Sequence, residues 1–219
     1  MGVFDIIGPV MIGPSSSHTA GAARLGKLAR TILGEKPLRA EIKLFGSFAK
    51  TYKGHGTDKA LIAGLLDMAA DDAGIKDAFS YALKDGLQFS FVVCESGGTH
   101  PNTAEFALTG VNGKKVRITG ISTGGGNVTV NRIDDYQVEI SGEYFTLITV
   151  HQDKPGIIAL VTQVLANDGV NIAFMRVSRN QRGLRALMIV ETDQQISARA
   201  LKEINALAPI ESALTIQPL

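Results

Sequence analysis

The fold of the C-terminal part is decided by the stretch DKPGIIALVTQVLANDGVNIAFM, residues 153–175. Its first half has apolar residues at helical spacing, with Pro155 at the start and Gly169 at the end. Proline and glycine are typical of these two helix ends, because proline lacks the N–H that a first turn leaves unused and glycine tolerates the left-handed conformation. The second half, from Asn171, has the composition of a strand. The stretch therefore predicts a helix that turns directly into a strand.

The segments on either side complete a domain. EYFTLITV (143–150) before this stretch and LRALMIVETD (184–193) after it are predicted strands. A helix in SARALKEINAL (197–207) and a last strand in IESALTIQ (210–217) follow. The order βαββαβ predicts a ferredoxin-like domain over residues 142–219, with both helices on one face of an antiparallel sheet.

Residues 1–141 have a different sequence pattern. Segments with helical spacing alternate with segments typical of strands, and glycines separate them. Helical spacing appears in TAGAARLGKLARTIL (19–33) and TDKALIAGLLDMAADD (57–72). LQFSFVVC (87–94) and KKVRITGI (114–121) have the pattern of strands. We predict an α+β domain here, so that the whole chain is an α+β protein of two domains.

Composition narrows the possible functions. The 219 residues include 22 Lys and Arg against 21 Asp and Glu, a formal net charge of +1, and no basic stripe with interleaved aromatic residues. We expect no nucleic-acid partner and, because no apolar run is long enough, no membrane span. The start MGVFDIIGPV has no basic region of a secretory signal, and the lone Cys94 fits a reducing compartment, so we expect a cytoplasmic protein. One cysteine also excludes an iron-sulfur cluster or a cysteine-based zinc site held by this chain alone.

The loop GPSSSHTAGAAR, residues 13–24, places three serines, His18 and Thr19 directly before a helix. One serine, for example Ser17, would be enough to cap the helix. The excess of hydroxyl groups at a helix N-terminus makes a donor-rich site that suits a carboxylate. The candidate ligand-binding residues of this loop are Ser15, Ser16, Ser17 and Thr19.

Three further loops set polar groups among glycines, where the backbone can approach a ligand closely. They are KGHGTDKA (53–60) around His55, GGTHPNT (97–103) around His100, and ISTGGGNV (121–128). Three of the four histidines of the chain lie in these loops and in the serine loop. The four loops therefore predict a ligand site in the N-terminal domain.

The C-terminal domain resembles an ACT domain, a small amino-acid-sensing module, from about residue 144 onward. The resemblance rests on residues 153–175, with the proline-glycine pair that opens the helix and Asn171 at the start of the next strand. It implies an amino-acid effector held by His151, Asp153 and Asn171, often across a dimer interface, and hence homodimerisation through this domain. The alternative is that the domain only dimerises and that Asn171 is a turn residue.

The four N-terminal motifs, in this order and followed by an ACT domain, resemble the beta chain of bacterial iron-sulfur-dependent L-serine dehydratases (L-serine ammonia-lyases). The resemblance implies an N-terminal domain like the allosteric-substrate-binding domain of some phosphoglycerate dehydrogenases. It also implies a separate alpha chain that carries a [4Fe-4S] cluster, and L-serine as the substrate that becomes pyruvate and ammonia. Cys94 alone cannot supply the thiolates of such a cluster, in agreement with a two-chain enzyme.

Under this resemblance, the cluster of the partner activates the serine hydroxyl, and this chain supplies a base and a carboxylate clamp. Histidine exchanges protons near neutral pH, so His55, between two glycines, is our first candidate for the base. His18 is the second candidate, or it orients the substrate. Asp58 either orients His55 or caps a helix. The serine loop would hold the substrate carboxylate, with His100 and Asn102 as further substrate-binding residues.

Two other functions are compatible with parts of the sequence. A non-catalytic, amino-acid-sensing regulatory protein would explain the ACT domain but leaves the histidine loops without a role. A regulatory fragment of a hydroxy-acid dehydrogenase is the second alternative. No G-x-G-x-x-G follows a strand in this chain, which excludes NAD binding in the Rossmann manner.

Overall fold

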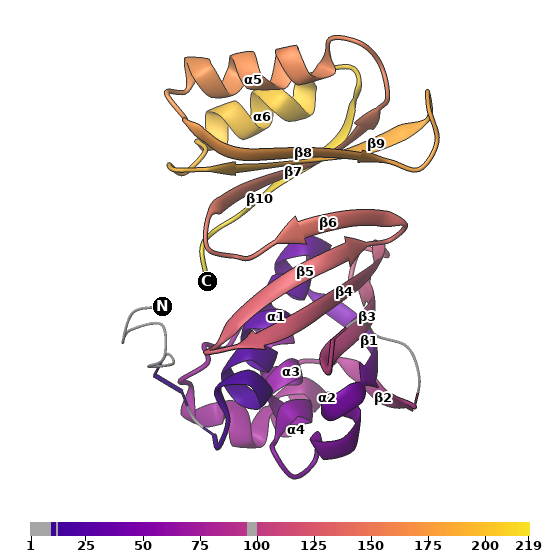
Figure 1. Cartoon of the computed structure of the whole chain (residues 1–219), viewed down its shortest axis with the longest axis vertical. Helices are drawn as coiled ribbons and strands as arrows, with labels where there is room; N and C mark the ends of the chain where they lie inside the picture. The colour runs from indigo at the N-terminus through magenta and orange to yellow at the C-terminus, as the bar shows by residue number, and fades with distance from the viewer. Residues whose placement is uncertain (1–9, 12, 96–99) are drawn as a thin grey trace. The chain divides into compact units, whose positions relative to one another are not determined.

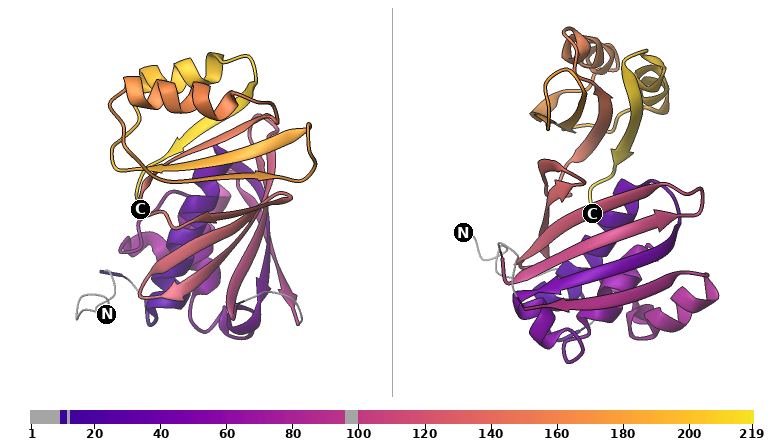
Figure 2. Two further views of the ribbon diagram at one scale, coloured as in Figure 1. Left: turned by 45° about the horizontal axis from the view of Figure 1, so that its top comes forward. Right: turned by 90° about the vertical axis from the view of Figure 1, so that its right-hand side faces the viewer.

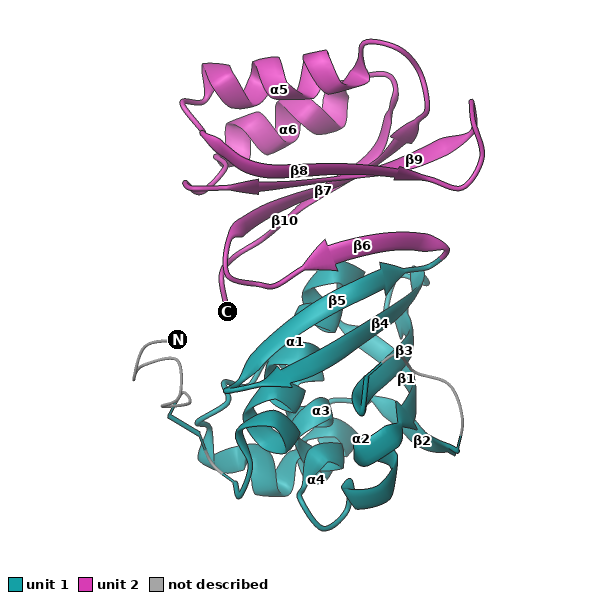
Figure 3. Cartoon of the chain, viewed as in Figure 1, with its two compact units in different colours: residues 1–134 teal, residues 135–219 magenta. Residues whose placement is uncertain are grey.

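The structure, a computed structural model, describes residues 10, 11, 13–95 and 100–219 (Figure 1). The chain divides into two units, residues 1–134 and 135–219 (Figure 3). Strand β6 (Tyr136–Ile140), which precedes the boundary expected at residue 141, falls in the second unit. Gly97 and Gly98, beside His100 in the sequence, and the start of the chain at residues 1–9 lie outside the described residues.

Helices form one layer of the first unit. The π-helix η2 (Ser16–Ala20) runs directly into α1 (Gly21–Leu33), and α2 (Gly46–Thr51), α3 (Thr57–Leu65), η3 (Ala73–Asp77) and α4 (Ala78–Lys84) follow. α1 packs along α3. Gly26 of α1 and Gly64 of α3 make this close approach possible, because a Cβ atom at Gly26 would overlap the carbonyl of Leu61 and one at Gly64 that of Ala23.

A sheet forms the other layer of this unit. Its strands β1 (Pro37–Phe45), β2 (Gln88–Cys94), β3 (Asn102–Gly110), β4 (Lys115–Gly124) and β5 (Asn127–Ile133) lie in the order β2-β1-β3-β4-β5. β1 and β2 are parallel, and the other neighbours are antiparallel. α1 packs against β3, β4 and β5, which places the helices over one face of the sheet (Figure 2). The α+β class predicted for this part is confirmed.

The helix predicted over residues 57–72 is wrong at its C-terminal end. α3 ends at Leu65, because Asp67 adopts a left-handed conformation with φ of 69°. The helix predicted over residues 19–33 begins in the π-helical turn, and the predicted strand 114–121 continues to Gly124.

The second unit has the predicted βαββαβ order. Its elements are β7 (Phe145–Gln152), α5 (Ile157–Asn167), β8 (Ile172–Arg179), β9 (Arg185–Thr192), α6 (Ala198–Ala206) and β10 (Ile210–Ile216). The sheet order is β10-β7-β9-β8 with antiparallel neighbours, and both helices cover one face (Figure 1). This is the ferredoxin-like arrangement expected from the sequence.

The core of the second unit lies between its helices and its sheet. Leu147 of β7 and Met188 and Val190 of β9 pack against Val161 and Leu165 of α5. Because side chains alternate along a strand, the residues between Met188 and Val190 and beyond them point to the other face. Among the described residues, no helix has the length and apolar character needed to cross a membrane.

Candidate functional site

His18 lies in η2 with both of its ring nitrogens hydrogen-bonded to serine hydroxyls. Its Nδ1 is 3.0 Å from Ser17 Oγ, and its Nε2 is 3.0 Å from Ser47 Oγ. Serine can donate or accept, so these contacts suit a neutral ring. Burial of the ring, and secondly the charge of His55, lower the pKa of His18. The two contacts hold the His18 ring in one orientation, and the lowered pKa favours its neutral form.

The serine loop folds back on itself at the start of η2. Ser15 Oγ accepts a hydrogen bond from the backbone N–H of His18 (3.2 Å) and lies 3.3 Å from Ser17 Oγ. The helix cap is therefore Ser15, and the sequence-based choice of Ser17 as the cap is wrong. Ser16 contributes its carbonyl, which accepts from the N–H of Gly21 five residues later and so creates the π-helical turn. Such turns are frequent at functional sites.

His55 stands edge-on to His18, with ring centroids 4.9 Å apart and an interplanar angle of 88°. Thr19 Oγ1 donates to the His55 carbonyl at 3.3 Å and ties the two loops together. His55 Nδ1 and Thr57 Oγ1 are both buried with no hydrogen-bond partner in the described part of the chain. Buried polar atoms without partners are costly and rare, so two of them in neighbouring residues make this segment a candidate functional site.

Asp58 does not orient His55. Its Oδ1 accepts from the Lys59 backbone N–H (2.8 Å), and no hydrogen bond joins its carboxyl to His55 among the described residues. Burial raises the pKa of Asp58. Asp58 lies in the first turn of α3, where a carboxylate interacts favourably with the free N–H groups of the helix.

Ser47 is a residue of this site that sequence reasoning missed. Besides its contact with His18, it donates its backbone N–H to the carbonyl of Pro101 at 2.7 Å. Gly46 precedes it with φ of 58°, and a Cβ atom there would lie 2.6 Å from Pro101 O. The signal available in the sequence is the glycine-serine pair directly after an alternating strand. Ser47 thus joins the His18 loop to the loop of His100.

His100 and Asn102 are held by contacts within their own loop and with β4. His100 Nδ1 accepts from the Asn102 backbone N–H at 3.1 Å, and its carbonyl accepts from Thr103 Oγ1 at 2.6 Å. Asn102 Nδ2 donates to the Ser122 carbonyl at 3.2 Å. These contacts fix the loop beside Gly46, with which Asn102 forms a β-bridge.

The glycine-rich segment 121–128 closes against the start of α1. A Cβ atom on Gly21 would overlap Ser122 Oγ, so a larger residue there would force the Ser122 side chain to move. Arg24 Nη1 donates to the Gly126 carbonyl at 3.2 Å. The first unit therefore connects all four predicted loops in one network, to which His18 is central.

In the second unit, His151 and Asp153 are engaged by neighbouring residues. His151 is buried, its Nδ1 lies 3.2 Å from Thr149 Oγ1, and burial lowers its pKa. Asp153 Oδ2 accepts from the Gly183 backbone N–H (2.9 Å) and from Arg179 Nη1 (3.0 Å). These two bonds, that of Gly183 first, lower the pKa of Asp153.

Asn171 lies far from Asp153 within one chain. It precedes β8, whose last residue, Arg179, bonds to Asp153, and an eight-residue strand spans about 25 Å. Asn171 Nδ2 instead donates to Asp193 Oδ2 at 2.6 Å. A site that uses His151, Asp153 and Asn171 together would therefore need residues from two copies of the chain.

The fold defines a protein of two units, in which an α+β unit with connected polar loops precedes a ferredoxin-like βαββαβ unit. Residues 144–209 match the family described as "ACT domain". Residues 2–84 match the family described as "Serine dehydratase beta chain".

Two curated relatives are similar in sequence to this chain over nearly its whole length. The chain is 46% identical over 208 residues to "Probable L-serine dehydratase, beta chain" of Bacillus subtilis, covering 95% of this chain and 94% of that one. It is 35% identical over 195 residues to "L-serine dehydratase, beta chain" of Peptoniphilus asaccharolyticus, covering 89% and 88%. A D-3-phosphoglycerate dehydrogenase of Synechocystis is 26% identical, covering 90% of this chain and 35% of its own length.

This chain belongs to the L-serine dehydratase beta-chain family. These relatives do not favour the non-catalytic regulatory alternative. The family resemblance implies a [4Fe-4S] cluster, and the donors of this chain do not fit one. Cys94 is its single cysteine, and within the described residues no group of three or more His, Cys, Asp or Glu side chains could hold a metal ion.

Proposed function

We propose that this chain is the beta subunit of an L-serine ammonia-lyase and converts L-serine to pyruvate and ammonia together with an alpha chain. The observation that carries the proposal is the edge-on pair of His18 and His55, in which His55 Nδ1 is buried without a partner in the described part of the chain. This pair lies at a hydroxyl-rich helix start, in a chain that is 46% identical to a probable L-serine dehydratase beta chain.

In this proposal the [4Fe-4S] cluster is bound by the alpha chain and not by this chain. When bound, such a cluster supplies a Lewis acid for the serine hydroxyl. This chain supplies the remaining chemistry, which is proton removal from Cα and a clamp for the carboxylate.

His55 is the proposed base. Its Nδ1 takes the proton from Cα of L-serine, and the electron pair of that C–H bond forms the double bond to Cβ. The Cβ–O bond breaks with its electron pair, and the hydroxyl leaves as hydroxide, which becomes water when the proton held by His55 is returned to it. The organic product, aminoacrylate, tautomerises to an imine, and water then releases pyruvate and ammonia. The atom assigned to this step has no hydrogen-bond partner in the described part of the chain, so the proposed transfer breaks no existing contact of that atom.

His18 is a positioning residue in this proposal, because both of its ring nitrogens are already hydrogen-bonded. Its ring packs perpendicular to the His55 ring and contacts the hydroxyl of Ser17. The carboxylate of the substrate binds at the start of η2, to the hydroxyls of Ser15, Ser16 and Ser17. Thr19 fixes the backbone of His55. His100 and Asn102, in the adjoining loop, are further substrate-binding residues in this proposal.

We further propose that the ACT domain forms homodimers and binds L-serine as an activator through His151 and Asp153 of one copy and Asn171 of the other. The separation of these residues within one chain supports a shared site.

The experiment that tests the proposal is reconstitution. The purified beta chain, alone and mixed with a cysteine-rich alpha chain, is incubated anaerobically with L-serine, and pyruvate is measured. We expect pyruvate and iron-sulfur absorbance only in the mixture. Stoichiometric iron and sulfide on the isolated beta chain, or pyruvate formed by it, would contradict the proposal that the alpha chain binds the cluster and that both chains are needed for activity.

A further inference from the structure

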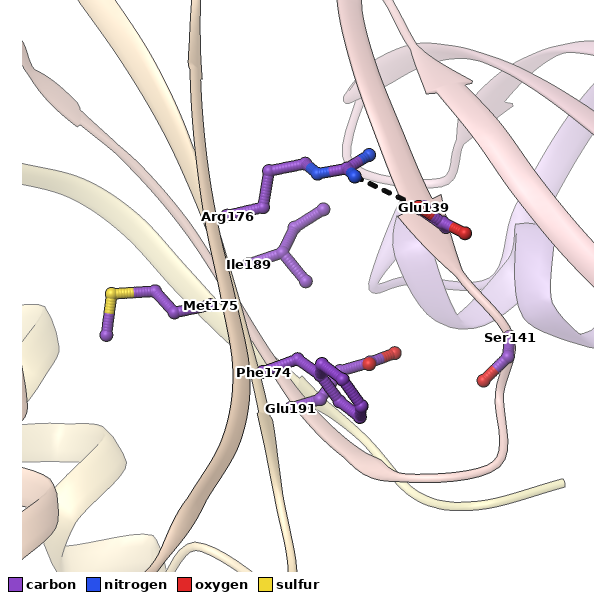
Figure 4. Close-up of a pocket in the computed structure, with 7 residues that line it drawn as sticks. All are labelled: Glu139, Ser141, Phe174, Met175, Arg176, Ile189 and Glu191. Atoms are coloured by element: carbon purple, nitrogen blue, oxygen red, sulfur yellow. Dashed lines mark ion pairs between the residues drawn. The ribbon is translucent and has the colours of Figure 1, made fainter.

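A cavity of about 310 Å³ lies in the second unit beside β6, β8 and β9 (Figure 4). Glu191 and Ile189 of β9 alternate with Met188 and Val190, which face the helices, so the cavity opens on the sheet face that the helices leave free. None of its lining residues is assigned above to the substrate or to the effector. The polar part of the wall is formed by Glu139, Arg176 and Glu191, and the apolar part mainly by Phe174 and Ile189.

Glu191 is an unusual residue for such a position. The residue is only 9% exposed, and its Oε1 has no hydrogen-bond partner in the described part of the chain. The backbone N–H of Ser141 favours the charged form of this carboxyl, but Oε1 stays without a partner. Burial, with smaller contributions from Glu139 and Glu143, raises the pKa of Glu191. Burying a carboxyl without a cationic partner destabilises the fold. A ligand that pairs with Glu191 would offset this cost.

The guanidinium of Arg176 does not offset the buried charge of Glu191. Arg176 Nη2 is paired with Glu139 Oε2 at 3.0 Å, as Figure 4 shows, and both side chains are more than half exposed. The wall of the cavity therefore has two carboxylates, Glu139 and Glu191, for the one cation Arg176, and carries an excess of negative charge. A cation is the ligand that this charge favours.

The kind of cation follows from the donors. The described residues contain no group of three acidic, histidine or cysteine side chains that could hold a metal ion. The cavity has room for a small organic molecule, and Phe174, which contacts Tyr144 edge-on and is still 59% exposed, offers an apolar wall. An ammonium group on a short carbon skeleton matches both the unpartnered oxygen and this wall.

We propose that the cavity binds a small organic ammonium ion, whose N–H group donates to Glu191 Oε1 and whose carbon skeleton packs against Phe174 and Ile189. The ammonium group can belong to a simple amine or to an amino acid, in which case Arg176 lies next to the carboxylate. The site does not depend on the proposed lyase reaction, because its residues are all in the second unit.

The test uses the full chain and three probes of similar size, which are propylamine, L-alanine and propionate. Binding is followed by calorimetry and by the rise in the melting temperature of the chain. We expect binding of propylamine or L-alanine and none of propionate. Tighter binding of L-alanine identifies an amino acid as the natural class of ligand, and tighter binding of propylamine identifies an amine. Absence of binding by both ammonium compounds would overturn the proposal.

Glu191→Gln is the decisive variant, since it keeps the shape of the side chain and removes its charge. We expect the Kd of the ammonium probe to rise about tenfold or more, while the melting temperature of the unliganded chain at pH 8 rises because a buried charge is gone. Glu143→Gln, outside the cavity wall, is the matched control and should leave the Kd within about twofold. Unchanged binding by Glu191→Gln would refute the site.

A second variant keeps the test informative if Glu191→Gln fails to fold. Phe174→Ala removes an exposed side chain and should weaken binding of propylamine several-fold. Binding as tight as that of the native chain would contradict the assigned wall.

Discussion

The rings of His18 and His55 stand at 88° to each other, and their hydrogen-bonding states differ. Both nitrogens of His18 are engaged by serine hydroxyls, whereas His55 Nδ1 is buried with no partner among the described residues. Two histidines in contact therefore have different roles. His18 is fixed by its hydrogen bonds, and His55 is the histidine to which we assign the proton transfer.

Ser47→Ala is expected to lower the turnover of the complex about threefold to tenfold, because a hydrogen bond worth about 0.5 to 1.5 kcal/mol no longer fixes His18 Nε2. Ser47→Thr keeps the hydroxyl and should restore most of the activity. The measurement is kcat and KM for L-serine, together with the nitrogen NMR signals of the His18 ring. An unchanged His18 tautomer equilibrium in Ser47→Ala would show that Ser47 does not position the ring.

The ACT-type domain could be predicted from the sequence because its signals are local. Helical spacing between Pro155 and Gly169 defines α5, and Ser197 caps α6 by accepting from Ala200 N–H. The early end of α3 was not predictable in the same way, because the left-handed conformation of Asp67 leaves the apolar pattern unbroken.

The candidate site was only partly predictable. The loops rich in serine, histidine and glycine identified His18 and His55, but their contact depends on how η2 and the α2–α3 connection pack, which local patterns do not encode. Ser47 was missed because a single serine after a glycine is common in turns. The strand β1 before it, which was not among the predicted strands, places Ala40, Ile42 and Leu44 alternately in the core.

Acidification is expected to destabilise the chain through its buried histidines. Burial lowers the pKa of His18 and of His151 in the folded state, so the unfolded state binds protons more readily as the pH falls below the ordinary histidine range. The free energy of unfolding therefore falls as the pH drops from about 7 towards the lowered folded-state values. The check is the melting temperature between pH 8 and pH 5, with His151→Gln expected to make the dependence shallower. An identical slope in that variant would exclude His151 as a contributor.

Gly64→Ala should destabilise the first unit by about 1 to 3 kcal/mol, because the added methyl group overlaps the Ala23 carbonyl where α3 meets α1. The measurement is urea unfolding. Gly54→Ala is the matched control, since its Cβ atom would meet nothing nearer than 3.7 Å, and it should change stability by less than about 0.5 kcal/mol. Equal stability of the two variants would contradict the close helix contact.

Asn171→Ala is expected to reduce the cooperativity of the complex towards L-serine while leaving its limiting rate nearly unchanged. The reason is that Asn171 lies in the proposed effector site, and allosteric coupling is typically about 1 to 3 kcal/mol. The measurement is the Hill coefficient from initial rates, with Asn205→Ala on α6 as a control away from that site. Unchanged kinetics, with no binding of L-serine to the second unit, would show that the ACT domain only dimerises.

The central claim is that His55 removes the Cα proton of L-serine, and His55→Ala in the reconstituted complex tests it most directly. We expect pyruvate formation to fall about 100-fold or more while the iron content, the absorbance of the cluster and the melting temperature stay close to those of the native complex. Lys53→Gln, an exposed change in the same loop, serves as the control. Normal turnover of L-serine by His55→Ala, with the cluster intact, would contradict the account and leave His18 as the next candidate for the base.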